Sequence, residues 1–125
     1  MSLKNVETVF CFNDASYPFD VRDAEYMSIL EDALEKLSEA EKNVQKVGKG
    51  SEIIIAQCDM LKDFFDDCFG EGAGIDICTE KSNIATHYEA YDAFLSFVRE
   101  QKDNIIESKN TFNKYSNRDQ RRKVK

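Results

Sequence analysis

The sequence predicts a mainly α-helical fold: an N-terminal β-hairpin, then three helices, then a basic C-terminal arm. Three segments carry apolar residues three or four apart, the spacing that aligns side chains on one face of a helix. Glycines separate these segments, at residues 48–50 and 70–74. At 125 residues, the chain is expected to form a single domain over 1–115 and a flexible basic tail over 116–125.

The hairpin is expected between residues 5 and 21. β-branched and aromatic residues dominate 6–12, and the Asn-Asp-Ala-Ser run at 13–16 is typical of a turn. Apolar and polar residues then alternate up to Val21, with Pro18 at a position that an edge strand tolerates.

The first helix is expected to begin near Asp20 or Asp23, either of which is a good N-cap, and to run to about Val47. Gly48 then interrupts the pattern. Its expected core stripe is Met27, Leu30, Leu34, Leu37 and Val44.

The second helix is expected from about Ser51 to Phe69. Two adjacent apolar stripes predict a central helix that is covered from two sides, with Leu61 and Phe65 in the core. The first stripe is Ile54, Cys58, Leu61, Phe65 and Cys68, and the second is Ile53, Met60 and Phe64.

A compact glycine-rich loop is expected over 70–81, followed by a third helix from Thr79 or Ser82 to about Tyr115. The near-heptad seam of this helix favours antiparallel packing or pairing with another helix, and Gln101 or Lys102 interrupts it. The seam is Ile84, Tyr88, Tyr91, Leu95, Val98, Ile105 and Phe112.

Charge is distributed unevenly along the chain. The last 12 residues hold six basic residues and one acid, a net charge of +5, whereas 11 basic and 23 acidic residues leave the rest at −12. We expect this basic arm to contact a protein, since the acidic body would repel nucleic acid. The candidate contact residues are Arg118, Arg121, Arg122 and Lys123.

Acidic residues cluster near the end of the second helix, at Asp63, Asp66, Asp67 and Glu71. Their spacing is not that of an EF-hand loop, so a solvated face or a partner-binding patch is favoured over a metal site. If the cluster binds a partner, Asp66, Asp67 and Glu71 are the candidates.

No catalytic constellation is recognisable. His87 has no nucleophile or carboxylate in a recognisable motif and is expected at the surface or at its boundary. The four cysteines lack zinc-knuckle spacing and are expected to be reduced and mostly buried. The glycines at 70–74 lack the strand and the Lys-Ser/Thr pair of a phosphate loop. We therefore expect no enzyme activity, metal, nucleotide or other cofactor.

No apolar run approaches the ~18 residues that a membrane span requires, and the N-terminus does not lead into the apolar core of a secretory signal. A cytoplasmic protein with no membrane partner is expected, while the sequence leaves its oligomeric state open.

Three segments in order carry a family resemblance. Tyr17 to Asp20 lead through Asp23-Ala24 into a helix, the series Phe65-Asp-Asp-Cys-Phe-Gly-Glu-Gly72 ends one, and Ser116-Asn-Arg-Asp-Gln-Arg-Arg-Lys123 comes near the end. Together they resemble the tail assembly chaperones of long-tailed bacteriophages and prophages of Gram-positive bacteria.

The resemblance implies a non-enzymatic role in the host cytoplasm. Such chaperones bind the tape measure protein, keep it soluble and help to recruit tail tube subunits. Two alternatives remain open: a structural head–tail or tail component that stays in the particle, and a small nucleic-acid-binding regulator that uses the basic arm.

Overall fold

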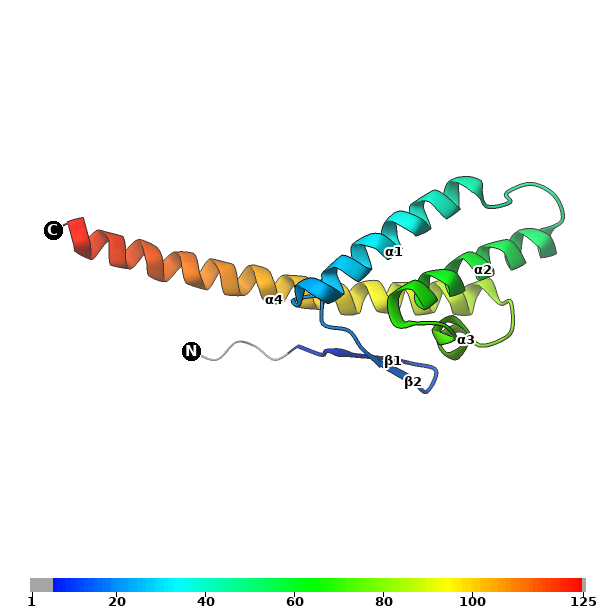
Figure 1. The fold of residues 1–125 in the computed structure, drawn as a ribbon, viewed down its shortest axis with the longest axis horizontal. Coiled ribbons are helices and arrows are strands. Elements are labelled where there is room, and N and C mark those ends of the chain that lie inside the picture. Colours follow the sequence, from blue (N-terminus) through cyan, green and yellow to red (C-terminus); the bar gives the residue numbers. More distant parts are fainter. Residues whose placement is uncertain (1–5, 125) are drawn as a thin grey trace.

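The computed structural model describes the chain from Val6 to Val124, with side chains described up to Asn110 and at Phe112. It is mainly helical, with a two-stranded antiparallel sheet at the N-terminus, as the sequence predicts (Figure 1). The α1–α2 pair lies on one side of the N-terminal half of α4, and the hairpin lies on the other (Figure 1).

The hairpin consists of β1 (Val9–Phe12) and β2 (Ala15–Pro18), paired so that Phe10 faces Tyr17. Asn13 and Asp14 form the two-residue turn, and both have positive φ, 49° and 65°. This conformation fits the right-handed twist of a hairpin, and Asn and Asp tolerate it better than most residues. The turn is therefore shorter than the expected 13–16.

Helix α1 (Ala24–Asn43) begins where Asp23 accepts a hydrogen bond from the backbone N–H of Glu25, at 3.1 Å. It ends before the expected Val47, because Val44 already has an extended backbone. Helix α2 (Gly50–Phe69) ends at Gly70, whose φ of 112° is strained for any other residue. It packs against α1, α3 and α4, as expected of a central helix.

The expected loop over 70–81 contains a short helix, α3 (Ala73–Cys78). Two tight turns at Gly70 and Gly72 redirect the chain, and Ala73, Ile77 and Cys78 are then buried. The number of glycines suggested a loop because it does not reveal that the residues after them pack on α2.

Helix α4 (Ile84–Val124) begins at Asn83, whose side chain accepts a hydrogen bond from the backbone N–H of Thr86, at 3.2 Å. Its backbone continues through the segment in which a flexible tail is expected, so the boundary near Tyr115 is not visible as a helix end. Whether 116–125 behaves as a separate tail stays a prediction.

Phenylalanines form the centre of the core. Phe94 of α4 is fully buried, and its ring lies 5.3 Å from that of Phe10 and 5.4 Å from that of Phe69, measured between centroids. Leu61 and Phe65 are buried, as expected. The other rings around Phe94 are those of Phe19, Phe64, Phe65 and Phe97.

The core face of α4 differs from the expected seam. Its buried residues include His87, Ala90, Phe94 and Gln101, whereas Tyr88 is exposed. The expected seam followed the large apolar residues, but this helix buries two polar side chains among aromatic ones. A stripe of the expected seam consequently remains outside the core.

Candidate interaction surface

The acidic residues near the end of α2 do not act as one patch. Asp66 is half-buried, and its Oδ1 accepts a 2.7 Å hydrogen bond from the backbone N–H of Gly74 in the first turn of α3. Asp67 forms a 3.9 Å ion pair with Lys36 of α1. Glu71 is exposed in the turn before α3. Thus Asp66 and Asp67 have internal partners, and Glu71 alone keeps the accessibility of a partner-binding candidate.

The four basic candidates, Arg118, Arg121, Arg122 and Lys123, belong to α4 by their backbone, but their side chains lie outside the described residues. Their role as partner contacts stays a prediction.

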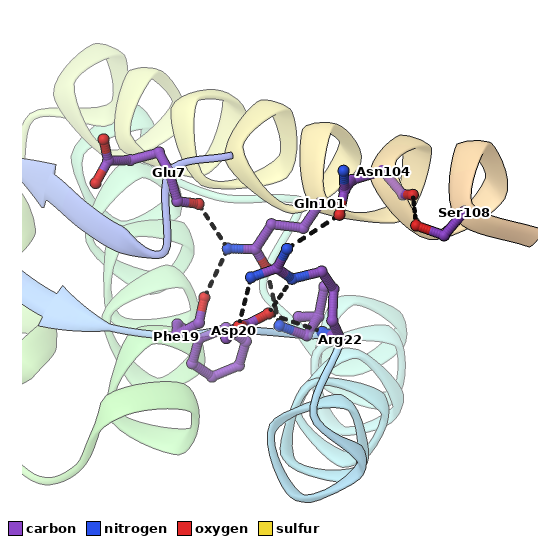
Figure 2. Close-up of polar contacts among 8 residues, drawn as sticks. Glu7, Phe19, Asp20, Arg22, Gln101, Asn104 and Ser108 are labelled. Atoms are coloured by element: carbon purple, nitrogen blue, oxygen red, sulfur yellow. Dashed lines mark hydrogen bonds and ion pairs between the residues drawn. The ribbon is translucent and has the colours of Figure 1, made fainter. Parts of the chain in front are cut away.

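Gln101 attaches α4 to the N-terminal segment. Its Oε1 accepts a hydrogen bond from the backbone N–H of Val21 at 2.8 Å, and its Nε2 donates to the carbonyl oxygens of Glu7 and Phe19, both at 2.9 Å (Figure 2). The Gln101 side chain is fully buried, so each of these bonds satisfies a group that would otherwise lose its water. The polar interruption of the seam therefore has a structural cause.

Arg22 makes a second connection one helical turn further along α4 (Figure 2). Its guanidinium donates to both carboxylate oxygens of Asp20 at 2.9 Å and to Oδ1 of Asn104 at 3.0 Å. The hydrogen bonds to Arg22 lower the pKa of Asp20 and keep the pair charged. Gln101 and Arg22 together set the direction in which α4 leaves the body.

Beyond these contacts, α4 extends well past the rest of the molecule (Figure 1). Its apolar side chains there are open to solvent: Ile105 is 37% exposed, Ile106 55% and Phe112 69%. Apolar side chains gathered on an unpacked helix are typical of an interaction site. Because Ile105 and Phe112 belong to the expected seam, the prediction that the seam pairs with another helix remains open for this half.

A groove lies between α1 and α4, with a volume of about 220 Å³. Leu30 and Val98 are buried in its lining, and Leu34 and Leu95 are half-buried. Two exposed cations complete the lining, Arg99 and Lys102. The sequence analysis assigned three of the four apolar residues to the core and Lys102 to an interruption. The available signal was the occurrence of cations within an apolar stripe.

His87 is fully buried, so its expected position at the surface is wrong. Its Nδ1 lies 2.7 Å from the carbonyl oxygen of Asn83 and donates to it, and Nε2 has no partner among the described residues. Burial lowers the pKa of His87, which keeps the ring neutral near pH 7. This geometry describes a core side chain with no reacting group beside it.

Three of the cysteines, Cys58, Cys68 and Cys78, are buried, and Cys11 is exposed. Burial raises the pKa of Cys68 to about 12 and that of Cys78 to about 11, so both thiols stay protonated at neutral pH. Residues 6–124, as far as their side chains are described, contain no cluster of three or more His, Cys, Asp or Glu that suits a metal ion. Over the same part of the chain, no helix is both long and apolar enough to span a bilayer.

Fold and surface together define a small helical protein with a projecting helix and an apolar groove. Residues 13–125 match the model of a family of unknown function, DUF6673, and the chain belongs to this family. No curated protein and no solved structure matches the chain.

Proposed function

We propose that this protein is a phage tail assembly chaperone, a non-enzymatic binding protein that holds the tape measure protein in the host cytoplasm and helps to recruit tail tube subunits. The observation that carries the proposal is the projecting half of α4, on which Ile105, Ile106 and Phe112 are exposed. The resemblance of residues 17–24, 65–72 and 116–123 to the chaperone family supports it further.

The physics of the proposed task matches this shape. A tape measure protein is a long helical rod whose apolar stripes are exposed until the tail tube encloses them. A helix that presents its own apolar side chains can cover such stripes. The body carries a net charge of −12 outside the last 12 residues, so complexes coated with it repel one another and resist aggregation.

Co-expression with the tape measure protein of the same genome tests the proposal. The soluble fraction of the tape measure protein is measured with the full chain, without it, and with the variant I106D/F112D. A matched control, S82D/S96D, adds the same charge at two exposed polar positions. We expect the full chain and the control to keep the tape measure protein soluble and the variant to fail. Equal insolubility with and without the full chain would overturn the proposal.

The alternative of a structural tail component differs in one measurable respect. A chaperone is absent from finished particles, whereas a structural component remains in them. Mass spectrometry of purified particles from an induced host therefore separates the two, and stoichiometric recovery of this chain from particles would favour the structural role.

A further inference from the structure

The groove between α1 and α4 combines an apolar floor with a basic rim. Leu30, Leu34, Leu95 and Val98 supply the apolar atoms, whereas Arg99 and Lys102 are exposed at its edge. In a body with a net charge of −12, a groove whose only charged lining residues are basic stands out chemically.

The two rim cations are not engaged within the molecule. None of the ion pairs among the described side chains includes Arg99 or Lys102. Glu100 and Asp103 follow them directly in sequence, but adjacent residues on a helix point about 100° apart and do not face each other. The cations are therefore available to carboxylates that approach over the groove.

The groove continues along α4 beyond the body. Val98, Ile105 and Phe112 are seven residues apart and lie on nearly one face, which drifts by only ~20° per heptad on a straight helix. Leu95, Lys102 and Lys109 form the adjacent row with the same spacing. From Val98 to Phe112 the track extends by about 21 Å, since each residue of an α-helix rises about 1.5 Å.

From this arrangement we infer that the groove and the α4 track bind an acidic amphipathic helix. Its apolar residues at i, i+3, i+4 and i+7 would occupy the groove floor and contact Ile105 and Phe112. Its flanking Glu or Asp residues would pair with Arg99, Lys102 and Lys109. On the proposed function, on which this part of the inference rests, the helix belongs to the tape measure protein.

Charge argues against two other occupants of the track. In a parallel in-register pair of two copies, Lys102 and Lys109 would each face their own counterpart, and like charges in such a seam are unfavourable. The chain's own last 12 residues carry a net charge of +5 and would be repelled by the same row of cations.

Photo-crosslinking in the co-expression system tests the inference. The crosslinking residue p-benzoylphenylalanine replaces Leu95 in the groove or, as a control, the exposed Ser96 beside it. Crosslinked peptides are identified by mass spectrometry, and circular dichroism confirms that both labelled proteins fold. We expect position 95, and not position 96, to crosslink to an acidic helical segment of the tape measure protein.

Charge reversal supplies the second arm. R99E/K102E should lower the crosslink yield at position 95 by at least about tenfold, because it turns two attractions into repulsions. K46E/K81E makes the same change in net charge at exposed positions away from the groove and should leave the yield unchanged. A crosslink to a second copy, a crosslink that persists in R99E/K102E, or none at position 95 would overturn the inference.

The two readouts keep this inference apart from the proposed function. A soluble tape measure protein without a crosslink at position 95 would leave the chaperone role standing and refute the groove as its binding site. A specific, charge-dependent crosslink to a tape measure protein that stays insoluble would do the reverse.

Discussion

A single amide side chain connects the N-terminal segment to the longest helix. Gln101 satisfies the N–H of Val21 and the carbonyl oxygens of Glu7 and Phe19 in a buried site. A buried backbone group left without a partner costs about 1–3 kcal/mol. Gln101→Leu keeps the approximate volume but removes all three bonds.

We expect Gln101→Leu to lower the free energy of unfolding by at least about 2 kcal/mol, since more than one buried group loses its partner. Gln57→Leu serves as the control, because Gln57 is only half-buried and makes none of the observed side-chain hydrogen bonds. Urea denaturation of both variants measures the difference. Equal midpoints would show that the hairpin attaches to α4 without this side chain.

Phe65 tests the aromatic core. It is fully buried, with its ring 5.5 Å from that of Phe64 and 6.0 Å from that of Phe94. Phe65→Ala removes a large buried side chain and should cost about 3–5 kcal/mol. Phe112→Ala is the same chemical change at a site that is 69% exposed, and we expect it to cost under about 0.5 kcal/mol. Thermal or urea denaturation of the pair separates the two, and similar losses would contradict the assigned core.

His87 predicts a pH dependence of stability. Burial lowers the pKa of His87 in the folded state below the ordinary value of 6.5, with Lys62 and Asp59 as the nearest charges that influence it. As pH falls through 6.5, the unfolded chain therefore takes up a proton that the folded chain refuses, and stability decreases. This decrease stops below the folded-state pKa.

We expect the melting temperature of the protein to fall more between pH 7.5 and pH 5 than that of His87→Gln, which cannot take up this proton. Taking the difference between the two curves removes the contribution of the carboxylates, including Asp63, whose pKa is raised mainly by burial. Parallel curves would mean that the ring is protonated in the folded state.

At the scale of elements, the sequence predicts long periodic segments well and short packed ones poorly. Helices α1 and α2 begin within one residue of an expected position, because Asp23 and the glycines at 48–50 mark those starts. Helix α3 was not predicted, since six residues are too few for a periodicity and their helix depends on contact with α2. The same limit applies to the groove, which requires the relative positions of α1 and α4.

The contact between α3 and α2 depends on Gly74. A Cβ at this position would collide with the backbone carbonyl group of Lys62, which cannot move without disturbing α2. We expect Gly74→Ala to displace α3 and to destabilise the protein by about 1–3 kcal/mol, the usual cost of overpacking.

Gly50→Ala is the matched control, because no atom lies within 4 Å of the added methyl group at the start of α2. Alanine favours helix over glycine by up to about 1 kcal/mol, so this variant should be neutral or more stable. Comparing the urea midpoints of the two glycine variants checks both expectations. A Gly74→Ala protein as stable as the Gly50→Ala one would show that α3 is not held tightly against α2.

At the scale of the whole molecule, composition and charge anticipated a small acidic helical body but not the projection of α4. The seam of α4 was expected to pack along its whole length. Its core face is instead set by side chains such as Phe94 and Gln101, and the rows through Leu95, Ile105 and Phe112 are left partly exposed. A sequence pattern does not say which of two adjacent apolar rows meets the body and which is left for a partner.

The basic arm is the last separate part of the molecule, and its net charge of +5 contrasts with −12 for the other residues. We expect a chain that ends at Tyr115 to unfold at the same temperature as the full chain, because the arm is too polar to add an apolar stripe to the core. The truncated chain should nevertheless hold the tape measure protein less well, since Arg118, Arg121 and Arg122 can each pair with carboxylates in a two-pronged geometry.

Salt weakens exposed charge contacts, which are screened over ~8–10 Å at physiological ionic strength. Binding to nucleic acid would weaken in the same way, so salt dependence cannot identify the partner of the arm. The deciding comparison co-expresses the full and truncated chains with the tape measure protein and, in parallel, measures DNA and RNA binding by gel shift. If truncation leaves tape measure solubility intact but abolishes tight nucleic-acid binding, the arm does not serve the chaperone, and the nucleic-acid-binding regulator replaces it as the explanation for these residues.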